Sequence, residues 1–354
     1  MAGPLARRYR RLLFCYPPTR RREELLATLL EAAPPERTRP TVREAANLIR
    51  HGLRARLGRP ASRAVTSAAL LATIISGLFA AAFATRAGWE TAEPLPRAAQ
   101  TRVMLAEILP GTNFRSIHDA PAMFGMYGQP LSWDNLTDLL FGDGGEYSLE
   151  SVGGTANGLP NRPQETLDRT RQRLLDTGWT VYPPMLHDTY TTLAARRGST
   201  TLTLDVHFEP TVYSEPTASA ADSIFLMATI QRATPPAVYP IAILGGIAGA
   251  VVAFLLFSWA SRRTDGQHLG RYSVTPLFGF TMILWWAPTL FAVPLMAKHH
   301  LDEPHPSWHP MWEWLGQPTY SLPVVVGGGC ALLSLTLAAT SRPRPDLLPT
   351  RAPW

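Results

Sequence analysis

The chain has 354 residues, of which 46% are hydrophobic and only 17% charged, and its formal net charge is +6. Its mean hydropathy of −0.02 averages very apolar stretches with ordinary polar sequence. This pattern excludes a single water-soluble globule, a disordered tail protein and a small disulfide-stapled secreted protein.

Residues 1–64 predict three short helices that begin near Leu5, Arg20 and Thr41. Pairs of prolines end the first two helices, after Tyr16 and Ala33. The third opens with a Thr41/Glu44 capping box and stops at Gly58 and Pro60. Its expected apolar face consists of Val42, Ala45, Ile49, Leu53 and Leu57.

Each apolar stripe in this prefix is too narrow to stabilise a helix by itself. The helices therefore pack on each other as an interaction module, or lie on the inner leaflet, where basic amphipathic helices are attracted to anionic lipid. A loosely ordered tail is the third alternative.

The prefix contains the runs Tyr9-Arg-Arg-Leu-Leu13, Glu24-Leu-Leu-Ala-Thr-Leu-Leu30 and Gly52-Leu-Arg-Ala-Arg-Leu-Gly58. In these runs it resembles the HAAS-type helical prefix that precedes the first span of many high-GC bacterial membrane proteins. The resemblance implies a signalling or regulatory context, since relatives are often encoded beside PadR-type repressors or precede permease-like regions. No catalytic residues belong to that prefix, and the remaining chain resembles no family in this way.

Four segments predict transmembrane helices and an α-helical membrane protein: residues 65–85, 239–260, 274–297 and 322–340. None contains Asp, Glu, Lys, Arg or His. A helix of about 20 residues covers a hydrocarbon core about 30 Å thick, so each segment is long enough, the last one barely.

The charges between these segments predict the orientation. Residues 1–64 hold 15 Arg against 5 Glu, whereas residues 86–238 hold 11 Arg against 17 acidic residues. The short loop 261–273 and the tail 341–354 are also basic, and the loop 298–321 is acidic. The positive-inside rule then places both termini in the cytoplasm of a bacterial plasma membrane protein, with the lipid bilayer as its first partner. The arginine-rich prefix shows no base-reading or stacking features, so no nucleic-acid partner is expected.

Residues 86–238 predict one extracytoplasmic α+β domain. Its core must stabilise it without disulfides, because the two cysteines, Cys15 and Cys330, lie elsewhere. A helix is expected at 97–109 and another from Pro163 to Gly178, followed by strands at 179–182, 190–196, 200–208 and 224–231. The middle two strands form a hairpin around Gly198. We expect a helix packed on an antiparallel sheet of about four strands, while residues up to Gly154 show little assignable pattern.

The sequence contains no phosphate loop, zinc-protease, nucleophile-elbow or dinucleotide motif, so an enzyme is not predicted. Ion-coupled carriers usually keep an ionisable residue at membrane depth. The four segments have none, which argues against an autonomous ion-coupled carrier.

One cluster of possible metal ligands lies in the loop 298–321. Its candidate ligands are His299, His300, His305 and His309, with Asp302, Glu303 and Glu313 nearby. Imidazole and carboxylate groups suit zinc, copper or nickel. The alternative is an interfacial loop whose Trp308, Trp312 and Trp314 sit at headgroup depth, without a cofactor.

Small residues favour close helix packing at Gly245 and Gly249 and again at Gly327 to Gly329. The packing is within the chain or, alternatively, between copies in a homo-oligomer.

Two function classes remain open. The first is a membrane sensor or regulator, in which the extracytoplasmic domain meets a ligand and the prefix contacts a cytoplasmic regulator. The second is a membrane subunit of a transport assembly that works through a separate ATPase. Its span arrangement is similar to that of mechanotransmitting ABC permeases of the division-associated and macrolide-exporter types.

Overall fold

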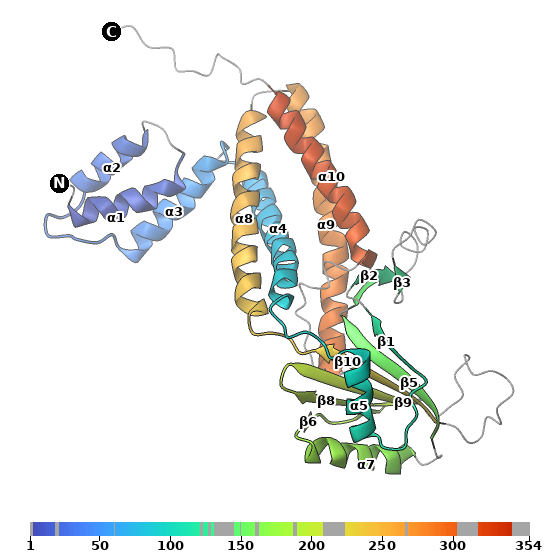
Figure 1. The fold of residues 1–354 in the computed structure, drawn as a ribbon. Helices are drawn as coiled ribbons and strands as arrows, with labels where there is room; N and C mark the ends of the chain where they lie inside the picture. The colour runs from blue at the N-terminus through green and yellow to red at the C-terminus, as the bar shows by residue number, and fades with distance from the viewer. Residues whose placement is uncertain are drawn as a thin grey trace, which may run out of the picture. The chain divides into compact units, whose positions relative to one another are not determined.

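A computed structural model gives the fold of the chain (Figure 1). The structure describes residues 3–17, 21–59, 61–120, 123–126, 129–130, 145–148, 150–159, 163–186, 190–207, 224–265, 268–302 and 318–341. The chain divides into two compact units. Residues 1–78, 247–286 and 324–354 form the first, and residues 79–246 and 287–323 form the second.

The predicted three-helix prefix is confirmed in the first unit. Its elements are α1 (Pro4–Leu12) with a short 3₁₀ turn η1 (Leu13–Cys15), α2 (Arg21–Glu31) and α3 (Val42–Arg56). The side chains that pack at its centre are Leu5, Tyr9, Leu13, Leu26 and Leu48. The prefix therefore has a small core of its own.

The expected apolar face of α3 is only partly correct, since Leu57, just after the helix, is 2% exposed as predicted. Val42 is 88% exposed and Ile49 and Leu53 are also exposed, whereas Leu48 and Gly52 are buried. A Cβ on Gly52 would lie 2.8 Å from the Cβ of Cys15, so the absence of a side chain lets η1 approach the helix closely. Counting large apolar residues misses a contact surface that is built on glycine.

The capping box at the start of α3 is confirmed. The Thr41 hydroxyl accepts a hydrogen bond from the Glu44 amide, and the Glu44 carboxylate accepts one from the Thr41 amide at 2.9 Å. The same carboxylate pairs with Arg37 at 2.8 Å and accepts a hydrogen bond from the Tyr9 hydroxyl at 3.3 Å. The Thr41 amide, and then Arg37, hold the pKa of Glu44 below its ordinary value of 4.5.

Four long helices cover the segments in which spans are predicted: α4 (Arg63–Trp89), α8 (Val238–Arg263), α9 (His268–Asp302) and α10 (Pro318–Thr340). Among the described residues, α4 and α8 are long and apolar enough to cross a bilayer, and the apolar part of α10, Val325–Thr340, is shorter. The unit boundaries fall inside these helices.

The second unit contains a seven-stranded sheet in the order β1-β5-β10-β9-β8-β6, with β7 also paired to β8. Its strands are β1 (Ser116–Ala120), β5 (Ser151–Leu159), β6 (Thr180–Val181), β7 (Met185–Leu186), β8 (Tyr190–Arg197), β9 (Thr200–His207) and β10 (Ile224–Arg232). A smaller sheet pairs β2 (Met123–Met126) with β3 (Gln129–Pro130) and β4 (Gly145–Ser148). All the pairings between the described strands are antiparallel.

The β8–β9 hairpin is confirmed, with Arg197 opposite Thr200 and Gly198 at a φ of +60°. The expectation of about four strands is too low because β1, β5 and the two-residue β7 were not predicted. Strand β5 contains Gly153 and Gly154, and a Cβ on Gly154 would lie 2.9 Å from the Ser116 carbonyl oxygen. Glycines that permit this close strand approach remove the alternation of large apolar residues that identifies a strand.

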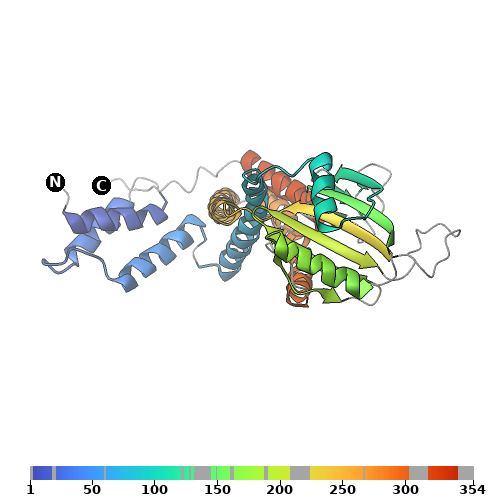
Figure 2. The ribbon, with the colours of Figure 1, turned by 60° about the horizontal axis from the view of Figure 1, so that its bottom comes forward.

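Two helices, α5 (Ala98–Ile108) and α7 (Pro163–Asp176), cover one side of this sheet, as Figure 2 shows. Both were predicted, although only one was expected to pack on the sheet. The central core residues are Leu105, Ile108, Leu174, Trp179, Leu193, Leu202, Leu204, Leu226 and Ile230. The α+β class of this unit thus follows from one apolar sheet face covered by two helices.

Leu204 lies at the centre of this core and is 1% exposed. We expect Leu204→Ala to reduce the local stability of the sheet by about 2–5 kcal/mol, because it removes buried contacts and leaves a cavity. Hydrogen–deuterium exchange of β9 in the full chain measures this loss. Met227→Ala is the matched control, since Met227 is 40% exposed. Equal protection of β9 in the two variants would contradict the assigned sheet face.

Glu44 makes the prefix sensitive to acid. Because its folded pKa lies below 4.5, its charge stabilises the folded prefix above that pH, and the stabilisation is lost as pH falls through the lowered value. Glu44→Gln keeps the capping geometry but removes the charge. We expect lower protection of α3 at about pH 6 and a weaker loss towards about pH 3 than in the wild type, measured by hydrogen exchange corrected for intrinsic rates. Glu36→Gln, at an exposed position between α2 and α3, should keep the wild-type slope.

Candidate functional site

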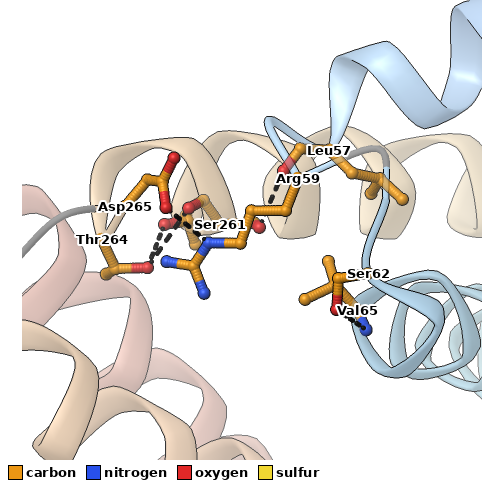
Figure 3. Close-up of polar contacts among 8 residues, drawn as sticks. Leu57, Arg59, Ser62, Val65, Ser261, Thr264 and Asp265 are labelled. Atoms are coloured by element: carbon orange, nitrogen blue, oxygen red, sulfur yellow. Dashed lines mark hydrogen bonds and ion pairs between the residues drawn. The ribbon is translucent and has the colours of Figure 1, made fainter. Parts of the chain in front are cut away.

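The C-terminal end of α8 meets the ends of two other helices of the first unit. The Ser261 hydroxyl donates a hydrogen bond to the Leu57 carbonyl at 2.8 Å, just beyond the end of α3 (Figure 3). The Arg263 guanidinium donates to the carbonyls of Ser341 and Ala339 at 3.1 and 3.0 Å, at the end of α10. The last carbonyls of a helix have no partner within it, so these side chains satisfy groups that would otherwise remain unpaired.

An ion pair also joins the residues after α3 to the end of α8. Arg59 Nε lies 2.8 Å from Asp265 Oδ1, and the two side chains are 22% and 47% exposed (Figure 3). An ion pair with this exposure is partly screened by solvent and stabilises little by itself. We call Leu57, Arg59, Ser261 and Asp265 the clasp, because together they attach the end of α3 to the end of α8.

Glycine allows the close approach at the clasp. Gly58 has a φ of +76°, and a Cβ there would lie 2.6 Å from the Arg262 Cγ. Gly58 is also the predicted stop of α3, and that prediction is confirmed. Beyond it, the Ser62 hydroxyl accepts a hydrogen bond from the Val65 amide at 3.3 Å at the start of α4. Leu57 and Arg59 therefore place the chain after α3 beside the end of α8.

The clasp borders a cavity of about 680 Å³ between α4, α8, α9 and α10. Its polar lining residues are Arg59, Ser62, Ser76, Ser261, Thr264, Asp265, Thr275, Thr281 and Ser334. Its aromatic lining residues are Phe257 and Phe278, whose ring centroids lie 5.0 Å apart, and Trp285. The volume is in the range of small-molecule sites, about 300–1,000 Å³. Polar and aromatic side chains therefore both line this cavity, and the hydroxyls of Ser261, Thr281 and Ser334 already donate to backbone carbonyls.

The predicted close packing at small residues occurs within the chain. A Cβ on Gly327 of α10 would lie 2.5 Å from the Trp285 Nε1 of α9, and the Thr281 hydroxyl donates to the Gly327 carbonyl at 3.2 Å. Gly245 of α8 lies against Ala80 and Ala84 of α4. Contact with a second copy stays a prediction.

The predicted metal ligands are only partly within the described structure. His299 and His300 lie near the end of α9, where the backbone alone is described, and His305 and His309 lie outside the described residues. Among the residues that are described, no group of three or more metal-ligating side chains comes together. The metal site in this loop stays a prediction.

A row of aromatic and polar side chains lies on the sheet face opposite the core of the second unit. The rings of Tyr190 and His207 stack at 5.0 Å, and His207 lies 5.5 Å from Phe225. Next to them the Thr192 hydroxyl donates to Asp205 at 2.6 Å. Sequence reasoning missed this row, because the residues come from three strands and meet only through sheet register.

Sequence reasoning also missed the clasp. Arg59 and Asp265 are 206 positions apart, and no local pattern connects them. The available signals were the glycine and proline after α3 and the basic end of α8, which mark helix ends without saying which ends meet. Comparison of the chain with protein-family models and with curated proteins gives no match.

We expect Gly58→Ala to weaken the clasp. Forcing alanine into the left-handed region costs about 1–2 kcal/mol, and the added Cβ also clashes with Arg262. The melting temperature of the full chain in detergent should fall. If the clash contributes, the double variant Gly58→Ala/Arg262→Ala should lose less stability than the sum of the two single variants. Strict additivity would show that the contact with Arg262 has no energetic effect.

Proposed function

We propose that the chain is an integral membrane sensor or regulator of a bacterial plasma membrane. It has four transmembrane helices, cytoplasmic termini and a HAAS-like cytoplasmic prefix. The α+β unit receives a ligand or an envelope partner outside, and the prefix passes the consequence to a cytoplasmic protein. No catalytic step is part of this proposal.

Exposed apolar side chains support placement of α8 in lipid. The most exposed are Ile243, Leu244, Ile247, Val251, Val252, Leu255 and Leu256, between 44% and 67% exposed. So large an apolar surface on one helix is unfavourable in water and favourable in hydrocarbon. The arginine-rich prefix and the acidic residues 86–238 support the orientation.

The clasp is the observation that carries the sensor proposal. Strand β10 ends at Arg232 and α8 begins at Val238, so a short connection links the sheet to this helix. At its other end α8 holds the end of α3 through Ser261 and Asp265. A displacement or rotation of α8 would therefore act on the prefix through hydrogen-bonded contacts.

A sensor needs two arrangements of its helices with unequal affinity for the signal. The cavity of about 680 Å³ beside the clasp supports the existence of two arrangements. Helices that line such a cavity can shift without displacing a packed core. Its occupant would favour one arrangement over the other.

The transport-subunit alternative requires a cytoplasmic surface to which an ATPase can bind. The connection between α8 and α9 is residues 264–267. That length leaves no room for a separate coupling helix, which favours the sensor proposal.

The topology can be tested with single cysteines in a Cys15→Ser/Cys330→Ser background. We expect a membrane-impermeant maleimide to label Arg171→Cys in intact cells and Arg10→Cys only after lysis, because both positions are exposed on their units. Labelling of Arg10→Cys in intact cells, or failure of the maleimide to label Arg171→Cys there, would contradict the proposed orientation.

The function class can be tested by affinity purification from native membranes with mass spectrometry. We expect the wild type to capture a cytoplasmic regulator and the variant Arg59→Ala/Ser261→Ala to capture less of it, since the prefix is then less firmly attached. Arg7→Ala/Arg8→Ala, at exposed positions of α1, is a control for charge. A stoichiometric ATPase partner would favour the transport subunit instead.

A further inference from the structure

A groove of about 710 Å³ lies in the first unit between the prefix and the helices α4 and α8. Its prefix side is formed by Phe14, Cys15, Arg50, Leu53, Arg54, Arg56 and Leu57. Its helix side is formed by Thr66, Ala69, Leu70, Thr73, Ala250, Val251, Phe254 and Leu255. It is distinct from the cavity beside the clasp, since the two have no lining residue in common.

The walls of this groove are effectively apolar. The hydroxyls of Thr66 and Thr73 donate to the carbonyls of Ser62 and Ala69 in or next to their own helix, at 3.0 and 2.6 Å, so they are already satisfied. Phe14 is 64% exposed and Leu70 is 58% exposed. Apolar side chains this exposed require an apolar occupant or hydrocarbon around them.

The prefix side of the groove carries positive charge that is available to a ligand. Arg56 is engaged, because it donates to the carbonyls of Cys15 and Phe14. Arg50 and Arg54 make no ion pair or side-chain hydrogen bond within the described part of the chain. They are four residues apart on α3 and therefore share a face. Among the described lining residues none is acidic.

We propose that this groove binds one anionic phospholipid. An acyl chain lies along Leu53, Leu70 and Val251, and the phosphate pairs with Arg50 and Arg54. The inference rests on the proposed membrane location, which puts diacyl lipid within reach. An apolar protein segment would fill the groove but leave the two guanidinium groups unpaired, whereas an anionic amphiphile satisfies both features. The exposed Leu53, which the core of the prefix does not use, then has a role.

Native mass spectrometry of the detergent-purified full chain tests the proposal. We expect one phosphatidylglycerol to be retained per chain, about 25-fold more tightly than phosphatidylcholine, because each arginine near an anionic headgroup increases binding about fivefold. Arg50→Gln/Arg54→Gln should lose that preference. Arg7→Gln/Arg8→Gln, which removes the same charge from exposed positions of α1, should keep it. Ala250→Phe, which fills the groove from α8, should reduce the binding of both lipids.

Equal affinity for the two lipids, or equal losses in the two arginine double variants, would overturn the proposal. A second copy of the chain in place of lipid would overturn it too, since the groove would then be a dimer interface. These results are separable from the topology: cysteine labelling reports whether the chain spans the membrane, and the lipid preference reports whether this groove recognises a headgroup.

Discussion

The final carbonyl groups of a helix have no partner within that helix, and this constraint organises the first unit. Arg22 donates to the carbonyls of Leu13 and Tyr16, and Arg56 donates to those of Phe14 and Cys15, so the end of η1 is held from both α2 and α3. In the same way Ser261 binds the carbonyl after α3, and Arg263 binds the last carbonyls of α10. Side-chain donors therefore connect helix ends that would each expose acceptors.

This use of arginine is chemically specific. The guanidinium group is a planar fork that can donate to two carbonyls at once, whereas a lysine ammonium is a point charge on a flexible stem. The chain contains Lys298 as its only lysine among 33 basic residues. Positive charge also suits the negative end of the helix dipole. Arginines of the prefix thus hold helix ends together, in addition to supporting the cytoplasmic location that we propose.

The sequence predicts elements well where periodicity and helix-stop signals agree. The prefix helices, the capping box at Thr41, the stop at Gly58 and the β8–β9 hairpin all follow from such local signals. Strand β5 and the packing face of α3 do not, because both depend on glycines whose missing side chains allow close contact. The clasp and the cavity could not be predicted, since they join residues from distant segments. The predicted four-helix membrane topology remains a proposal, supported by α4 and α8.

The two sides of α3 contact different parts of the first unit. A single apolar periodicity therefore does not predict which of its residues are buried. One side presents Leu48 and Gly52 to the rest of the prefix and is buried. The other presents Leu53, Arg50 and Arg54 to the groove, and Leu57 and Arg59 after the helix belong to the clasp. A helix needed only to complete the prefix core would gain nothing from exposed leucine beside arginine. The division of α3 between a protein core, an amphipathic groove and a helix end therefore favours a connecting element over a passive anchor.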